Sequence, residues 1–289
     1  MSAPDLAVVY TTRDSMRTIE RSLLAVRSIA TRIVVVDSGS TDGTVERCKA
    51  LGCEVFHRPW HGHERSGSLA TQKQFGIDRI EHEGWILLLD SDEIPTPALV
   101  ESIRAAVERD DHSIDAYLLN RRHWYKGGWI SAEHPDRILR LFRRGRAHMR
   151  PRLVHEVLEC EGRTARLSGQ LRHESWLDFS DALERALRYA RASALIPEER
   201  TSIAKLLFNA PWSFFKTFLL QGGCRDGWRG VEASTALAAR SLFKHLFIAE
   251  RRRGDRRKRR RPGLVSTPSA TLATHVDLRP EPVGSGRAG

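Results

Sequence analysis

Three absences narrow the classes to which this chain of 289 residues can belong. Its four cysteines form no CxxC pair and have no zinc-type spacing to histidine, and a disulfide framework would be unusual in a chain of this size. No stretch reaches the ~18 to 20 uninterrupted apolar residues that a membrane-spanning helix needs. The N-terminal MSAPDLAVVYTTRDS has no basic segment followed by an apolar run and a cleavage site. We therefore expect reduced thiols in a cytoplasmic chain without a membrane span.

Excess positive charge is also missing from most of the chain. Of the formal net charge of +11, residues 251–261 carry +8, from nine basic residues and one acid, so the rest is close to balanced. No aromatic residues interleave these arginines and no nucleic-acid module accompanies them, so nucleic acid is not the expected partner. A polybasic run gains roughly 1 kcal/mol per Lys or Arg near an anionic membrane. We expect this segment to bind such a surface, with a merely solubilising tail as the alternative.

Short apolar runs alternate with amphipathic helical patterns in the first part of the chain. The runs cover residues 6–10, 33–36 and 85–89, and apolar residues at helical spacing follow each of them. This alternation predicts an α/β fold with a mostly parallel sheet covered on both faces. Ligands in such folds bind outside the carboxyl ends of the strands. From Ala116 onward, strand-like pieces follow one another without helices, which predicts an antiparallel annex.

An apolar run leads directly into three carboxylates in WILLLDSDE, where Asp90, Asp92 and Glu93 follow the strand. Acids crowded at a strand end repel one another unless a cation compensates them, and an Asp-X-Asp pair offers the oxygen ligands that Mg²⁺ or Mn²⁺ prefers. The alternative is a solvated acidic entry to the helix that Thr96 and Pro97 begin. Asp37, in VVVDSGSTDGT, lies at a second strand end and favours the ligand-binding interpretation.

Taken in order, VVVDSGSTDGT, the segment with Gln72 and Lys73, WILLLDSDE, RILRLFRRG, VHE and HESW resemble a family 2 glycosyltransferase. The resemblance runs from about residue 6 to 250 and is nearest to lipopolysaccharide core β-1,4-glucosyltransferases. It implies a GT-A (nucleotide-diphospho-sugar transferase) fold, with a catalytic domain over residues 1–175. Apolar residues at helical spacing from Ser180 to about Glu250 predict a helical extension over residues 176–250. We expect residues 251–289 to form a disordered basic tail.

The resemblance also implies an inverting transfer of a sugar, with glucose the expected sugar, from a UDP-sugar donor. By position, Asp37 would contact the uracil, Asp90 the ribose side, and Asp92 the metal bound to the diphosphate. The carboxylate pair Asp90 and Asp92 is our candidate metal site. Thr11 and Asp14 lie in the first donor-binding loop, where the family usually has an Asn-Glu pair and this chain has Arg13-Asp14.

An inverting displacement requires a base that removes the proton of the acceptor hydroxyl. The candidates are Glu156 in LVHEV, and Asp136 and Glu133 in the preceding loop. Glu156 is preferred, because an acid within an apolar, strand-like stretch is hard to explain structurally. Lys73 could add positive charge near the leaving diphosphate, or could be an ordinary exposed helical lysine.

Two further features concern the acceptor and the membrane. The run of Arg137, Arg140, Arg143 and Arg144 is either a solvated face or a contact for a phosphorylated acceptor. Aromatic residues and lysines alternate over residues 205–219, which suits either a helix in the lipid interface or packing against the catalytic domain. The expected enzyme is therefore peripheral at the cytoplasmic face of the inner membrane, with a lipid-linked glycan as acceptor.

Two other functions fit parts of the pattern. A nucleotidyltransferase uses a related α/β core and a carboxylate-bound metal, but the chain lacks the glycine-rich basic N-terminal loop expected of one. A non-catalytic scaffold that binds lipid or nucleic acid would keep the fold without turnover. The product of the reaction separates the first alternative, since nucleotidyl transfer releases pyrophosphate and sugar transfer releases UDP.

Overall fold

The structure is a computed structural model, and it describes residues 5–60, 69–81, 84–131, 136–150, 156–195 and 201–260. Its contacts divide the chain into two compact units, Met1–Ala249 and Glu250–Gly289. All four cysteines are free.

The first four strands form the parallel half of the central sheet. They are β1 (Leu6–Thr12), β2 (Arg32–Asp37), β3 (Glu54–His57) and β4 (Trp85–Asp90), in the spatial order β3-β2-β1-β4. The strands alternate along the chain with α1 (Ile19–Val26), α2 (Thr44–Ala50) and α4 (Ala70–Asp78), and α5 (Pro97–Arg109) follows β4 and the short strand β5. Alternating apolar strands and helices thus give the doubly covered sheet that the sequence predicts.

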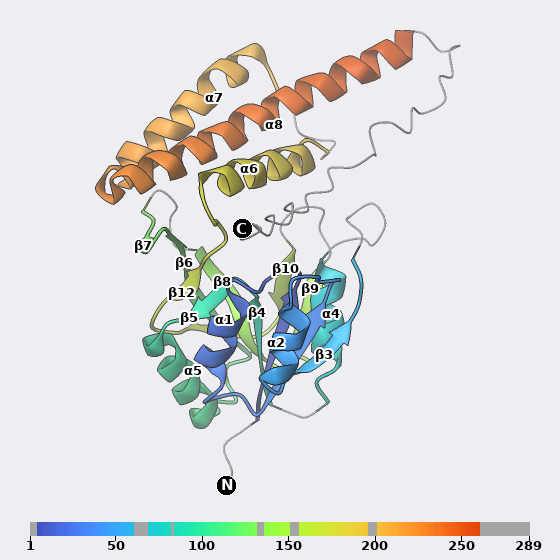
Figure 1. Ribbon diagram of the computed structural model, residues 1–289, viewed down its shortest axis with the longest axis vertical. Coiled ribbons are helices and arrows are strands. Elements are labelled where there is room, and N and C mark those ends of the chain that lie inside the picture. The colour runs from blue at the N-terminus through green and yellow to red at the C-terminus, as the bar shows by residue number, and fades with distance from the viewer. Residues whose placement is uncertain are drawn as a thin grey trace, which may run out of the picture. The chain divides into compact units, whose positions relative to one another are not determined.

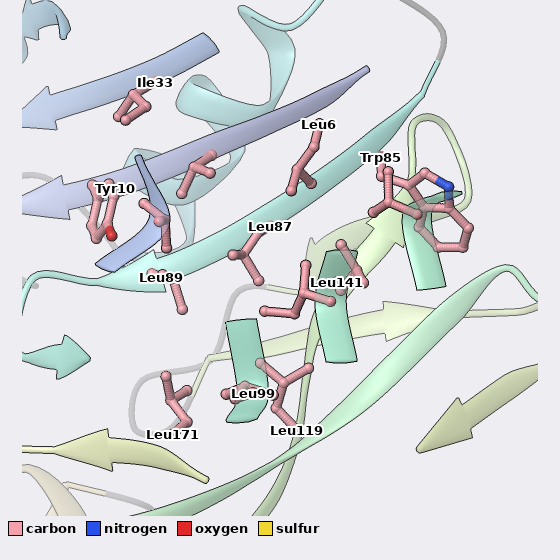
Figure 2. Close-up of a cluster of buried hydrophobic side chains, with 14 of the residues drawn as sticks. Leu6, Tyr10, Ile33, Trp85, Leu87, Leu89, Leu99, Leu119, Leu141 and Leu171 are labelled. Carbon is pink, nitrogen blue, oxygen red and sulfur yellow. The ribbon is translucent and has the colours of Figure 1, made fainter. Parts of the chain in front are cut away.

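Successive residues of β1 and β4 enter two different hydrophobic cores, because side chains along a strand alternate between the two faces. Leu87 and Leu89 join the core that α1, α2 and α5 cover, which Figure 2 shows around Trp85 and Tyr10. Ile86 and Leu88 join the core on the α4 side. Both faces are buried, which is why these strands are continuously apolar rather than alternating.

The second half of the sheet mixes strand directions. β8 (Asp136–Arg143) pairs antiparallel with both β4 and β6 (Ala116–Tyr125). β12 (Leu171–His173) and β11 (Thr164–Arg166) pair parallel with β6, and β5 (Glu93–Pro95) pairs antiparallel with β12. The prediction of an antiparallel annex was therefore wrong for β11 and β12, which run in the same direction as β6. β7 (Gly128–Trp129) extends β6 as a hairpin, and β9 (Ala147–Arg150) with β10 (Val157–Cys160) forms a separate two-stranded ladder.

The chain then becomes helical. The elements are α6 (Phe179–Ala194), α7 (Ile203–Phe215), the π-helix η1 (Lys216–Leu220), the 3-10 helix η2 (Gly223–Asp226) and α8 (Trp228–Arg260). Figure 1 shows α6 and α7 on the side of the sheet away from the N-terminus.

Two polar contacts join this helical region to the sheet. The Asp226 carboxylate accepts hydrogen bonds from the backbone N–H and hydroxyl of Ser131, and Lys126 pairs with Glu232 at 2.7 Å. No helix in the described ranges combines the length and the apolar character that a membrane crossing requires.

Helix α8 continues through the first part of the basic run. The sequence analysis ended this helix near Glu250 and expected disorder from residue 251, whereas residues 251–260 are helical. Arginine and lysine are good helix formers, and cations near a helix C-terminus interact favourably with its dipole. The helical pattern therefore extends where apolar periodicity has already stopped. The expected disorder of residues 261–289 lies outside the described residues.

Candidate active site

The register of the parallel strands brings the predicted polar residues to one edge of the sheet. Thr12 at the end of β1 lies opposite Asp37 at the end of β2, and Thr11 lies opposite Asp90 at the end of β4. Residues about 80 positions apart in the chain thus become neighbours because three apolar strands end at the same level. This is the edge at which α/β sheets bind ligands.

A cavity of about 1360 Å³ lies above this edge. Thr11, Lys73, Asp90, Asp92 and Glu156 line it from the strand side. Residues of α6, η1 and α8 line it from the other side. The cavity is larger than the ~300 to 1,000 Å³ of a typical small-molecule pocket, so it has room for more than one substrate.

Asp90 is held between two cations. Its Oδ1 lies 2.7 Å from Nζ of Lys73, and its Oδ2 accepts a hydrogen bond of 2.8 Å from Nη2 of Arg140. Burial alone would raise the pKa of Asp90, but the charges of Lys73 and Arg140 hold it well below its usual range. Asp90 is therefore a fixed carboxylate whose two oxygens both have protein partners.

Glu93 holds the turn of residues 90–93, called the acidic turn below, from inside the protein. Its side chain is fully buried, and it accepts hydrogen bonds from Arg140 at 2.8 and 3.0 Å and from Arg121 at 3.1 Å. It also accepts the backbone N–H of Asp90 at 3.0 Å, which closes the turn. Glu93 thus has a structural role, and only the first two acids of DSDE line the cavity.

These contacts correct three expectations. The acids at the end of β4 are compensated largely by the protein's own cations, so their crowding is not by itself a sign of a metal. Lys73 is buried, not an exposed helical lysine, and its Nζ also lies 3.7 Å from Oε1 of Glu156. Arg140 is buried as well, so the basic run on β8 is not a uniform solvated or phosphate-binding face.

Asp92 faces His173 across the turn. Its Oδ2 lies 3.5 Å from Nε2 of His173, which β12 brings beside β5. Burial alone would raise the pKa of Asp92, but His173 opposes this and the pKa is lowered. Burial would likewise lower the pKa of His173, and Asp92 raises it above its usual value. The two groups therefore stabilise each other's charged forms.

Asp92 is the acid best placed to hold a divalent ion. Within the residues that the structure describes, no group of three or more His, Cys, Asp and Glu side chains could hold a metal by itself. Mg²⁺ is nevertheless often bound by one or two carboxylates together with substrate phosphates. Asp92 suits this arrangement, because its contact to His173 is longer than a strong hydrogen bond. Asp90 suits it less well, since Lys73 and Arg140 occupy its oxygens.

Asp37 lies beside the cavity but does not line it. Its carboxylate is fully buried and accepts hydrogen bonds from the backbone N–H groups of Gly39 and Ser40, at 3.0 and 3.1 Å. Nδ1 of His57 lies 3.2 Å from the same oxygen. Asp37 therefore shapes the turn after β2, and Ser38 is the residue that lines the cavity. The uracil contact of Asp37 stays a prediction.

The loop after β1 is tied to that turn. Asp14, with a φ of 46°, accepts the backbone N–H of Thr41 at 2.8 Å, and its own N–H donates to Ser40 at 2.9 Å. Thr11 and Arg13 line the cavity, and Asp14 joins the two loops. Arg13, in the pair that departs from the usual Asn-Glu of the family, therefore lines the cavity. Donor binding by Thr11 and Asp14 stays a prediction.

The two described base candidates have different surroundings. The Glu156 side chain is 17% exposed and lines the cavity near Lys73. Asp136 also lines the cavity, but its side chain is 53% exposed and pairs with Arg121 at 2.8 Å. Glu133 lies outside the described residues. A base in a partly enclosed position beside the acids suits Glu156 better, and this assignment stays a prediction.

The sequence analysis did not name Arg121, and it interpreted Arg140 only as part of a solvated or phosphate-binding run. Arg140 lies between Leu139 and Leu141 in the apolar central part of β8. A charge in such a strand requires a buried partner of opposite sign. That signal was present in RILRLFRR, but the sequence could not identify Glu93 and Asp90 as the partners.

Replacement of Arg140 tests the structural role of this ion network. We expect Arg140→Leu to lower the free energy of unfolding by about 3 to 5 kcal/mol, because Glu93 would be left buried with incomplete compensation. The matched variant Arg137→Leu, on the exposed part of the same strand, should change it by less than about 1 kcal/mol. Urea unfolding monitored by circular dichroism measures both. Equal effects of the two variants would contradict the network.

Comparison with known proteins adds independent information. The sequence model of the family described as "Glycosyl transferase family 2" matches residues 7–161, which include the parallel strands and the acidic turn. The lipopolysaccharide core biosynthesis glycosyltransferase LpsC of Rhizobium meliloti is 29% identical over 216 residues, covering 70% of this chain and 77% of LpsC. An uncharacterized glycosyltransferase of Rickettsia prowazekii is 33% identical over 110 residues, which are 38% of this chain and 34% of that protein.

Solved structures give a more remote likeness. Glucosyl-3-phosphoglycerate synthase from Mycobacterium tuberculosis, in complex with Mn²⁺, UDP and phosphoglyceric acid, is 21% identical. The match covers 43% of this chain and 44% of that one, with a TM-score of 0.32. At that score the likeness carries no argument about ligands.

Proposed function

The chain belongs to glycosyl transferase family 2, and from this premise we propose that it transfers a sugar from a UDP-sugar to a hydroxyl group of a lipid-linked glycan. The observation that carries the proposal is the register that gathers Thr11, Asp37 and Asp90 at one sheet edge, below a cavity large enough for two substrates. The transfer is proposed to invert the anomeric centre. Glucose is the proposed sugar.

The leaving group defines what the acidic turn must do. Breaking the bond between the anomeric carbon and the phosphate leaves negative charge on the diphosphate. A Mg²⁺ or Mn²⁺ ion held by Asp92 and the phosphates would stabilise that charge when bound. Lys73 is fixed at the same edge by Asp90 and supplies a positive charge there without a metal. Asp90 orients Lys73, and its proposed contact to the ribose side would be made by oxygens that already bind Lys73 and Arg140.

The acceptor hydroxyl needs a base on the opposite side of the sugar. Glu156 follows the ladder strand β9 and precedes β10, and it reaches the cavity beside Lys73. We assign it the removal of the hydroxyl proton as the oxygen attacks. Asp136, tied to Arg121, is the alternative.

The relatives suggest the acceptor class. LpsC is named for lipopolysaccharide core biosynthesis, and the match spans most of its length. We propose by analogy that the acceptor here is a lipopolysaccharide core or another cell-envelope glycan, which places the enzyme at the cytoplasmic face of the inner membrane.

An exposed apolar face on α7 and η1 supports attachment to a membrane surface. Helix α7 has no buried residues, and Ile203 is 77% exposed, Phe208 70% and Trp212 57%. Leu207, Phe215 and Leu219 are exposed as well, and the spacing of Phe208, Trp212, Phe215 and Leu219 places these four on one face. Soluble monomers rarely expose so many contiguous large apolar side chains, and aromatic residues suit the lipid interface. The basic run that begins at residue 251 would add attraction to anionic lipids.

Binding of the nucleotide tests the donor proposal. UDP with Mn²⁺ at about 100 times its dissociation constant should stabilise the protein by ~2.7 kcal/mol, and each alone by much less, because the ion needs phosphate oxygens to complete its coordination. Asp92→Asn should lose the joint effect, and the charge-matched control Glu108→Gln, on an exposed position of α5, should keep it. Thermal unfolding measures all three. Undiminished metal-dependent binding in Asp92→Asn would exclude Asp92 as the ligand.

Turnover tests the choice of base. We expect Glu156→Gln to lower kcat by about 10² to 10⁴, the usual contribution of a general base, while the affinity for UDP with Mn²⁺ stays unchanged. Asp136→Asn should lower kcat by less than about fivefold. A panel of UDP-sugars with a soluble glycan acceptor provides the assay, and release of UDP rather than pyrophosphate distinguishes sugar transfer from nucleotidyl transfer. A larger loss of kcat in Asp136→Asn than in Glu156→Gln would assign the base to Asp136 instead.

Vesicle sedimentation tests attachment through α7. We expect the triple variant Leu207→Ser, Phe208→Ser and Trp212→Ser to lower partitioning onto phosphatidylglycerol vesicles by more than about tenfold, because the buried apolar area is lost. The control triple Met16→Ser, Leu24→Ser and Leu177→Ser removes exposed apolar side chains elsewhere and should leave it unchanged. Equal losses would count against the α7 face. A concentration-dependent increase in mass without lipid would assign that face to a second copy of the chain.

A further inference from the structure

The two walls of the cavity differ in charge. The strand wall is nearly balanced in charge, with six acids and five Lys or Arg residues: Asp90, Asp92, Asp136, Glu156, Glu159 and Glu161, and Arg13, Lys73, Arg121, Arg137 and Arg140. The helical wall presents basic residues from three separate elements, listed in chain order as Arg185 of α6, Lys216 of η1 and Arg240 of α8. Among the described residues of these helices that line the cavity, none is acidic. The helical wall is therefore a cationic surface opposite the proposed donor site.

Arg185 is oriented by its own helix. Its Nε donates to both carboxylate oxygens of Asp181, one turn earlier, at 3.1 and 3.2 Å. The guanidinium group has further N–H donors beyond Nε that can serve a ligand.

Lys216 is placed by an unusual piece of helix. It is the first residue of η1, where α7 changes from α-helix to π-helix. Thr217 is buried beside it, and its hydroxyl donates to the carbonyl of Ser213 at 2.8 Å. Short π-helical segments are often found at functional sites, because they rotate the following side chains away from the α-helical positions. Here Lys216 and Thr217 line the cavity, while Leu219 and Leu220 are exposed.

We propose that Arg185, Lys216 and Arg240 bind an anionic group, a phosphate or a carboxylate, of the acceptor. This inference rests on the proposed function, which places the donor diphosphate at the strand wall. An acceptor anchored by its negative charge on the helical wall would hold its hydroxyl between the walls, within reach of Glu156. The acceptor class is therefore an acidic glycan rather than a neutral one.

The test uses small probes on the full chain saturated with UDP and Mn²⁺. Ligand-observed NMR titrations compare glucose 6-phosphate, glucuronate and glucose. We expect at least one anionic probe to bind about tenfold or more tighter than glucose, as charge-assisted hydrogen bonds allow. Lys216→Gln combined with Arg240→Gln should abolish that preference. The matched double variant Lys49→Gln and Arg188→Gln removes the same charge from exposed positions outside the cavity and should retain it.

Three results would overturn the inference. One is equal binding of the charged and neutral probes, and another is equal loss of the preference in both double variants. The third is displacement of the anionic probe by UDP with Mn²⁺, which would assign the basic wall to the donor diphosphate. Failure of UDP to bind the wild-type protein would reject the donor proposal instead, and the probe titrations without nucleotide would still test the basic wall. Which anionic probe binds tighter separates phosphate from carboxylate.

Discussion

The ion network around Arg140 is the constraint on which the rest of the site depends. Burying Glu93 at the end of β4 is unfavourable unless a cation is buried with it, and Arg140 fulfils this requirement from β8. The same guanidinium group holds Asp90, which in turn holds Lys73 from α4. The strand β8 and the helix α4 are thus both fixed to one acidic turn.

This network frees one acid for ligand chemistry. Asp90 and Glu93 have their charges satisfied within the protein, whereas the ion pair of Asp92 in the described part of the chain is the one with His173, at 3.5 Å. Asp90 and Asp92 both line the cavity, but only Asp92 lacks a close partner for each carboxylate oxygen among the contacts of the described residues. A preorganised turn of this kind does not have to rearrange when charge develops on a leaving group.

The sequence predicted the parts of the fold that depend on local patterns. Continuous apolar runs such as 85–89 identify buried parallel strands, and their ends locate Asp37 and Asp90 at the ligand-binding edge. It did not predict the parallel pairing of β12 with β6, because strands of three residues carry too little pattern to fix a direction. Register between distant strands depends on the whole core.

For the site, the sequence identified candidate acids but not the contacts that surround them. Residue type and spacing were enough to choose Asp92 and Glu156 as candidates. Burial of Lys73 and Arg140 could not be deduced, since long basic side chains are usually exposed and only tertiary contacts show otherwise. The cationic wall of the cavity combines residues of α6, η1 and α8, and no short motif contains all of them.

The side chains of β4 alternate between two cores, so the length of the strand fixes the position of Asp90. Deleting one residue before Asp90 would exchange Ile86 and Leu88 with Leu87 and Leu89, so every side chain would face the wrong layer. Deleting two would restore the faces but draw the acid back by about 6.6 Å, past the reach of Lys73. Length changes in this family member should therefore be confined to its loops, and the distance from strand start to acid should be among its most slowly evolving properties.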